Sequence, residues 1–179
     1  MRYALAVLAL LLAASARAAP LPSAAALSRE IDATGAKAVV DRLAETTPDT
    51  KGETEWDRLI DRIWDGDETY IALAPRLRPG ADAAAAESLP IGLAHALTVA
   101  PAAVLRTLPA NGGLKETLGV CTIPFIEDTV KDIPAYVHDT EAALGRVTAP
   151  DLQSIKSACL VNLRKAAKTI ANYRLTHAR

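Results

Sequence analysis

The chain has 179 residues, of which half are apolar but only 4% are aromatic. Its 20 basic and 21 acidic residues give a net charge of −1, so it lacks the excess of positive charge on which nucleic-acid binding depends. The composition therefore excludes a nucleic-acid-binding protein and favours closely packed, alanine-rich helices.

The N-terminal residues 1–18 have the three parts of a secretory signal peptide. Arg2 precedes an apolar run over residues 3–14, and the small-x-small sequence that ends at Ala18 provides a cleavage site. The run is shorter than the roughly 20 residues that span a bilayer, which disfavours a retained membrane anchor. We therefore predict cleavage after Ala18 and export to the periplasm or the medium, with residues 19–179 forming a single all-helical domain.

Charge is divided unevenly along the predicted mature chain. Residues 19–100 hold 8 basic and 14 acidic residues, whereas residues 101–179 hold 10 basic and 7 acidic residues. From Arg164 to the last residue there are five basic residues and no acid. We expect an acidic half of helical hairpins over residues 27–108 and a helical half with a basic end over residues 114–179.

Helical periodicity covers most of the chain, because apolar residues recur at spacings of three and four and no segment alternates as a strand would. In the acidic half this pattern predicts helices over residues 28–45, 53–64 and 67–77. Gly35 is a weak point in the first of them, and Pro75 should kink or shorten the third. Trp56 falls in the core-facing stripe of the second helix, whereas Trp64 falls at the edge of that stripe.

Predicted helices continue to the end of the chain. Asp82 is placed to cap a helix that extends to residue 99 with a break at Pro90, and Pro101 can open a short helix to residue 108. Further helices are expected over residues 123–131, 133–147 and 150–173. The last of these places seven residues on one apolar face: Leu152, Ile155, Cys159, Leu163, Ala166, Ile170 and Tyr173.

The stretch IWDGDETY, residues 63–70, gathers three carboxylates around Gly66. An EF-hand loop with Gly66 at its sixth position would have Ile63 and Ala72 where oxygen ligands are required, so the stretch does not fit a calcium loop. A catalytic acid pair would need a cleft that separates the pKa values of its carboxyl groups. We favour a corner between two helices, ended by Gly66 and capped by Asp67, over a functional acid cluster.

Residues 53–108 form a succession of helix, turn and helix that resembles an irregular repeat of the HEAT or armadillo type, in which stacked helix pairs expose a binding groove. With its signal peptide, the chain is also similar to small exported all-helical proteins of Gram-negative bacteria. The resemblance implies an all-α fold, either an irregular multi-helix bundle or a short HEAT-like array, and it transfers no catalytic residue.

Cys121 and Cys159 are the two cysteines of the chain, and the predicted export takes them to a compartment where disulfides persist. We expect one structural disulfide between them, which stabilises the fold by roughly 4 kcal/mol in the chain-entropy model. Two buried free thiols or a redox pair are the alternatives, although a redox pair usually has the sequence Cys-x-x-Cys.

The sequence contains no recognisable metal or cofactor motif. His95, His138 and His177 are isolated from one another, so no zinc pattern is present, and His95 is expected to be a structural or surface residue. Neither a phosphate-binding glycine loop nor the nucleophile elbow of hydrolases occurs. We therefore expect no cofactor and no metal, and no catalytic residue is identified.

Two classes of function remain open. The favoured one is a non-catalytic protein that binds another exported protein, as an inhibitor, an immunity-type protein or an assembly factor. Asp57, Asp61 and Asp65 recur every four residues and form one row on a helix, which together with Trp64 is the candidate surface for a basic partner. The alternative is an enzyme that uses these acids. Membrane binding by the last helix is disfavoured, because its apolar face should be buried and its basic residues complement the helix dipole.

Overall fold

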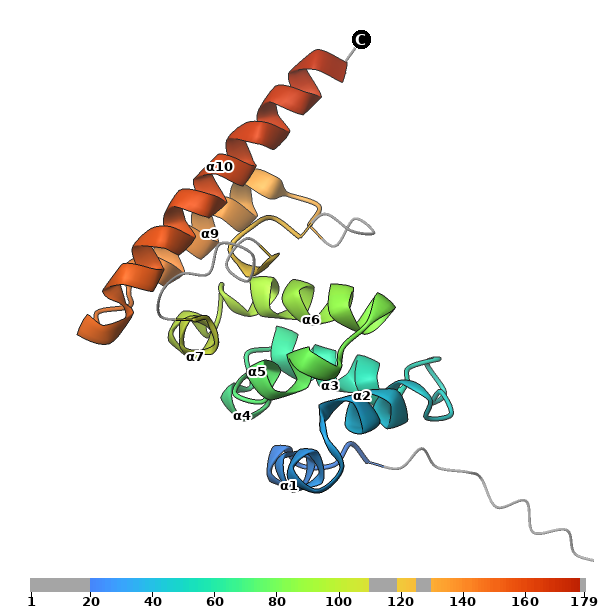
Figure 1. Cartoon of the computed structure of the whole chain (residues 1–179). Helices are drawn as coiled ribbons and strands as arrows, with labels where there is room; N and C mark the ends of the chain where they lie inside the picture. The colour runs from blue at the N-terminus through green and yellow to red at the C-terminus, as the bar shows by residue number, and fades with distance from the viewer. Residues whose placement is uncertain (1–19, 110–118, 125–129, 178–179) are drawn as a thin grey trace, which may run out of the picture.

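A computed structural model describes residues 20–109, 119–124 and 130–177 (Figure 1). Every regular element in these ranges is a helix, which confirms the predicted all-α class. The elements in chain order are α1 (Ala24–Thr34), α2 (Ala36–Ala44), α3 (Glu55–Trp64), α4 (Glu68–Ile71), α5 (Ala74–Leu77), the 3-10 turn η1 (Arg78–Gly80), α6 (Ala83–Ala96), α7 (Pro101–Thr107), α9 (Ile133–Gly145), the 3-10 turn η3 (Pro150–Leu152) and α10 (Gln153–His177).

The centre of the N-terminal part is the pair α3 and α6, which pack side by side and run in the same direction. Near their N-terminal ends the indole of Trp56 donates a hydrogen bond of 2.9 Å to the Ser88 hydroxyl, and near their C-terminal ends Trp64 stacks on His95. Gly92 lies between these contacts and lets the helices approach, since a Cβ there would lie 3.2 Å from an isoleucine side chain of α3. α4 packs on both α3 and α7, and through these contacts the pair is connected to the C-terminal part of the chain.

The helix predicted over residues 28–45 is divided into α1 and α2 at Gly35. Gly35 has a φ of 85°, which glycine adopts readily and which ends a right-handed helix. The two helices are then held together by Arg42, which pairs with Glu30 at 2.5 Å and with Glu55 of α3 at 2.9 Å. The prediction of one continuous helix was therefore wrong, although Gly35 was correctly identified as its weak point.

α6 continues through Pro90, where a break was predicted, so that prediction was wrong. Pro90 has no N–H to donate to the carbonyl of Ala86, so this carbonyl lacks its helical hydrogen bond. Ala86 is exposed, and water can therefore donate to the carbonyl instead. Asp82 occupies the predicted N-cap position, but its carboxylate caps no amide and lies 3.4 Å from the Lys37 ammonium instead. An ion pair with α2 has replaced the expected local cap.

The helix predicted over residues 67–77 consists of two short helices, α4 and α5. Pro75 lies in the first turn of α5, where a missing N–H leaves no helical hydrogen bond unformed. The expectation that Pro75 shortens this helix is confirmed.

The C-terminal part is a hairpin of α9 and α10 that packs beside α7. Arg164 of α10 donates a hydrogen bond of 2.6 Å to Glu141 of α9, and the two helices run antiparallel (Figure 1). One apolar cluster extends from Leu27 of α1 to Cys159 of α10, and a smaller cluster fills the space between α9 and α10. The helix predicted over residues 123–131 is not found at residues 123–124 or 130–131, and its middle lies outside the described residues.

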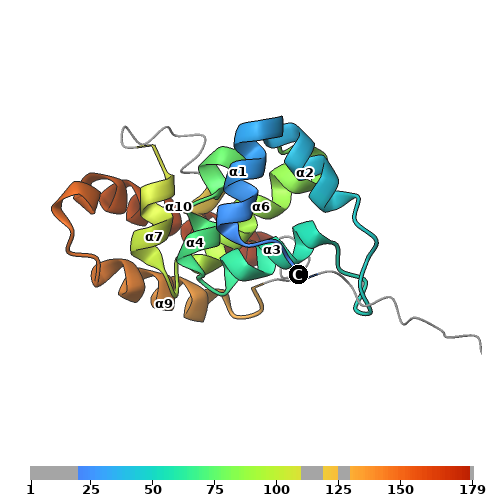
Figure 2. The same ribbon diagram turned by 90° about the horizontal axis from the view of Figure 1, so that it is seen from below.

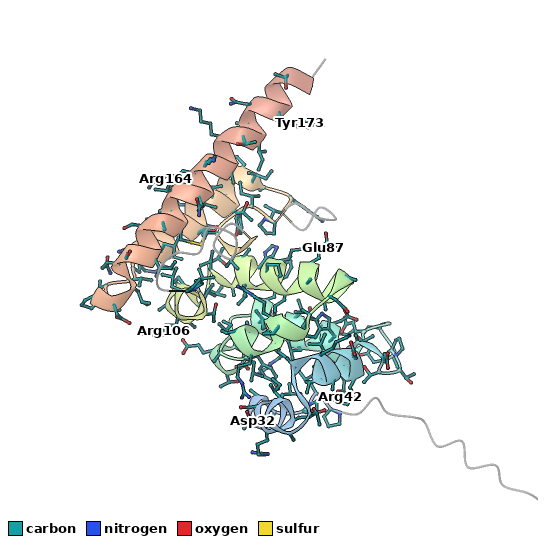
Figure 3. The ribbon with its side chains drawn as sticks, in the orientation of Figure 1. Asp32, Arg42, Glu87, Arg106, Arg164 and Tyr173 are labelled. Carbon is teal, nitrogen blue, oxygen red and sulfur yellow. A yellow bond between two sulfur atoms is a disulfide. The ribbon has the colours of Figure 1, made fainter. Side chains whose placement is uncertain are left out.

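The apolar stripe predicted on the last helix is buried only over its first half. Leu152, Ile155, Cys159 and Leu163 are at most 5% exposed, whereas Ala166 and Ile170 are half-buried. Tyr173 is 63% exposed, because the last turns of α10 extend beyond the other helices (Figures 1 and 3). The expectation that the whole stripe is buried was therefore wrong at its C-terminal end. None of the helices that the structure describes is both long and apolar enough to cross a bilayer.

Candidate partner-binding site

The stretch IWDGDETY is a corner between α3 and α4, as predicted. Gly66, with a φ of 86°, ends α3, and the amides of Gly66 and Asp67 donate to the carbonyls of Ile63 (2.9 Å) and Arg62 (3.0 Å). The Asp67 carboxylate accepts hydrogen bonds from the amide (3.0 Å) and the hydroxyl (2.6 Å) of Thr69, and it pairs with Arg62. The hydrogen bond from the Thr69 hydroxyl is the main cause that lowers the pKa of Asp67, and the contact with Arg62 lowers it further. The negative charge of Asp67 is therefore paired with groups of the corner itself.

The candidate acidic row lies on one exposed face of α3. Asp57, Asp61 and Asp65 are all exposed. Asp57 also belongs to the capping box that starts the helix, since its carboxylate accepts hydrogen bonds of 2.8 Å from the amide and the hydroxyl of Thr54. The pKa of Asp61 is raised, first by partial burial and then by the negative charges of Asp65 and Asp57. The row is therefore a surface on which carboxylates repel one another.

Trp64 lies beside this row and is half-buried. One face of its indole stacks on His95 of α6, with ring centroids 3.3 Å apart and planes 13° from parallel. His95 also makes an edge contact with the ring of Tyr136 of α9, with the two ring centroids 5.9 Å apart. His95 thus joins Trp64 of α3 to Tyr136 of the C-terminal hairpin, and the part of the Trp64 ring not covered by His95 is what it can offer to a partner.

His95 is a structural residue, one of the two roles expected for it. Its Nε2 is buried and has no hydrogen-bond partner, and burial of the ring lowers its pKa to about 4. The neighbouring Tyr136 hydroxyl lies 2.9 Å from the Ala94 carbonyl and 3.2 Å from the Thr122 carbonyl, and burial raises the pKa of this phenol. Sequence periodicity could not locate this cluster, because its rings come from three separate helices.

Cys121 and Cys159 form the predicted disulfide, with an S–S distance of 2.08 Å and Cα atoms 5.0 Å apart. Both cysteines are fully buried. The bond therefore ties the segment before Ile123 to the buried half of α10, and the alternatives of free thiols and an exposed redox pair are excluded in this structure.

Two cavities open where α4, α7 and the turn after α9 meet. α7 contacts both α4 and α9, and Figure 2 shows these helices from below. One cavity, of about 350 Å³, is bordered by Glu68, Val99 and Arg146, and the other, of about 240 Å³, by Glu68 and Arg106. Glu68 was considered in the sequence only as part of the helix corner, and the other three residues were not singled out, because no local pattern indicates that their elements meet.

Within the described ranges, no group of three or more histidine, cysteine, aspartate or glutamate side chains is placed to hold a metal ion. The acidic row therefore offers charge without the convergence of ligands that a metal centre needs. Comparison with protein-family models, with curated proteins and with solved structures found no match for this chain. Function is consequently inferred from the surface chemistry of the chain itself.

Proposed function

We propose that this chain is an exported, non-catalytic helical protein that binds another protein of the same compartment through the acidic row of α3, with Trp64 at its edge. Two features support export: the signal-peptide pattern of residues 1–18, and a buried disulfide of the kind that persists in oxidising compartments. An inhibitor, an immunity-type protein and an assembly factor are all roles of this kind.

The observation that carries the proposal is the repulsion within the acidic row. Asp61 and Asp65 form no side-chain hydrogen bond or ion pair in the described part of the chain, and the charges of Asp57 and Asp65 help to raise the pKa of Asp61. A basic surface docked on this row would replace repulsion with attraction and would also accelerate association at low ionic strength.

Several other acidic residues are instead paired with arginine. Glu30 and Glu55 share Arg42, Asp32 pairs with Arg76, and Glu141 pairs with Arg164. Internal ion pairs therefore neutralise these carboxylates, whereas the charges of Asp61 and Asp65 stay available to a partner.

The proposal is tested by affinity capture from periplasmic extract with the oxidised mature protein as bait. Asp61→Lys and Asp65→Lys reverse charge in the row without touching the capping box, and Asp139→Lys reverses an exposed charge on α9 as a matched control. We expect one stoichiometric partner on the wild type and on Asp139→Lys, and its loss on the two α3 variants and at raised salt. Equal capture by all four proteins would refute the role of the row.

A further inference from the structure

The two cavities beside α7 form one surface, which we call the Glu68 groove. Glu68 borders both cavities, and the walls between the charged residues are formed largely by small apolar side chains, among them Ala72, Val99, Ala103, Ala143 and Val147. Val99 is 62% exposed, although large hydrophobic side chains elsewhere in the described chain are mostly buried. The groove thus combines small apolar walls with charged residues, and no described segment covers it at Val99.

The charged residues of the groove alternate in sign. Arg146, in the turn after α9, borders the first cavity, Arg106 of α7 borders the second, and Glu68 of α4 is common to both. All three side chains are exposed, and none of them forms a hydrogen bond or an ion pair in the described part of the chain. The groove therefore presents a positive, a negative and a positive charge in succession, each free to meet a ligand.

The helix corner fixes the middle of this groove. Gly66 lies so close to Val99 that a Cβ on Gly66 would be 2.8 Å from a Val99 methyl group, and the Asp67 cap sets the start of α4 immediately before Glu68. The position of Glu68 relative to Val99 is thus held by backbone geometry, which lowers the cost of ordering these residues on binding.

We propose that the Glu68 groove binds an extended segment of another protein in which two acidic side chains flank a basic one. In an extended segment, every second side chain points to the same face, so acidic, basic and acidic residues at alternate positions can face Arg146, Glu68 and Arg106 in turn. The apolar walls of the groove fit the backbone of the segment and the small side chains that lie between its charged residues. This inference goes beyond the proposed function, because it concerns a second surface with the opposite charge preference and does not depend on the acidic row.

The test is a titration of the ¹⁵N-labelled, oxidised mature protein with the peptide acetyl-Ala-Glu-Ala-Lys-Ala-Glu-Ala-amide, followed by NMR. We expect chemical-shift changes at the amides of Val99, Ala103 and Thr148, which lie in the two cavities. Reversal of either arginine, in Arg106→Glu or Arg146→Glu, should weaken binding at least about five-fold, because it removes one exposed ion pair and adds repulsion between like charges. Arg29→Glu, which reverses an exposed arginine on α1, is the matched control and should bind as the wild type does.

The charge-inverted peptide acetyl-Ala-Lys-Ala-Glu-Ala-Lys-Ala-amide completes the design. It should leave the chemical shifts of the groove amides unchanged. If it changes only the shifts of α3, the peptide binds to the acidic row and not to the groove. Absence of groove shifts at millimolar acidic peptide, or equal shifts with the inverted peptide, would overturn the proposal. So would groove shifts that follow protein concentration without peptide, because they would indicate self-association instead. Should Arg146→Glu fail to fold, Arg146→Gln removes the same charge without reversing it.

Discussion

Acidification should destabilise this protein through His95. The imidazole stacks on Trp64 and makes an edge contact with Tyr136, its Nε2 is buried without a hydrogen-bond partner, and burial lowers its pKa in the folded state to about 4 from 6.5. Between these two values the unfolded chain binds a proton that the folded chain does not. The stabilising contribution of the neutral ring is therefore complete above pH 6.5 and is lost progressively as the pH falls towards 4.

The size of this effect follows from the difference between the two pKa values. At 1.36 kcal/mol for each pKa unit, a change from 6.5 to about 4 sets an upper limit of about 3.4 kcal/mol. The ring is only half-buried, so solvent screens part of this cost, and we expect the free energy of unfolding to fall by about 1–2 kcal/mol between pH 7.5 and pH 4.5 on account of His95.

The assay is urea unfolding of the wild type and of His95→Phe at pH 7.5 and at pH 4.5. Phenylalanine keeps an aromatic ring beside Trp64 and cannot be protonated, so subtracting the pH dependence of the variant removes the contributions of all other titrating groups. The wild type should lose about 1–2 kcal/mol more than the variant on acidification. The same loss in both proteins would refute the assignment, and so would an NMR titration of His95 with a midpoint near 6.5.

Three further predictions concern the disulfide, the core and the N-terminus. Replacing both cysteines with serine should lower the free energy of unfolding in urea by about 4 kcal/mol, and a loss below about 1 kcal/mol would contradict the stabilising role of the bond. Trp56→Ala should cost about 3–5 kcal/mol, because the indole is only 4% exposed, whereas Trp56→Phe should cost about 1 kcal/mol for the lost hydrogen bond to Ser88. Unchanged stability of the alanine variant would mean that the ring is not part of the core. Mass spectrometry of exported protein should find Ala19 at or next to the N-terminus, and an intact Met1 would refute cleavage.

Features that depend on neighbouring residues were predictable from the sequence. The corner at Gly66 and Asp67 follows from the positive φ that glycine tolerates and from the capping chemistry of a short carboxylate, and the structure has both. The amphipathic pattern likewise placed Trp56 correctly in the core. The pairing of Cys121 with Cys159 needed no geometry, since two cysteines allow a single intramolecular bond.

Features that depend on contacts between distant segments were not predictable. Periodicity assigned the face of the last helix correctly but could not tell that its hairpin partner α9 does not extend as far as Tyr173 (Figure 3). The cap expected from Asp82 was replaced by an ion pair with Lys37, which lies 45 residues earlier in the chain. Propensity alone also overstated the effect of Pro90, through which α6 continues at a point where the i−4 residue, Ala86, is exposed.

Both candidate surfaces illustrate the same limit. The acidic row lies within one helix, and its spacing of four residues was visible in the sequence. The Glu68 groove combines residues of α4 and α7 with the turn after α9, and nothing in the sequence indicates that Arg106 and Arg146 border the same channel.

Hydrogen exchange of the protein with and without its captured partner tests the central claim most directly, since it maps the contact on the unmodified chain. If the acidic row binds the partner, exchange should slow in peptides that cover α3 and the corner that follows it, and it should be unchanged over the exposed last turns of α10. Slower exchange confined to α10, or no change over α3 in a stoichiometric complex, would contradict the account.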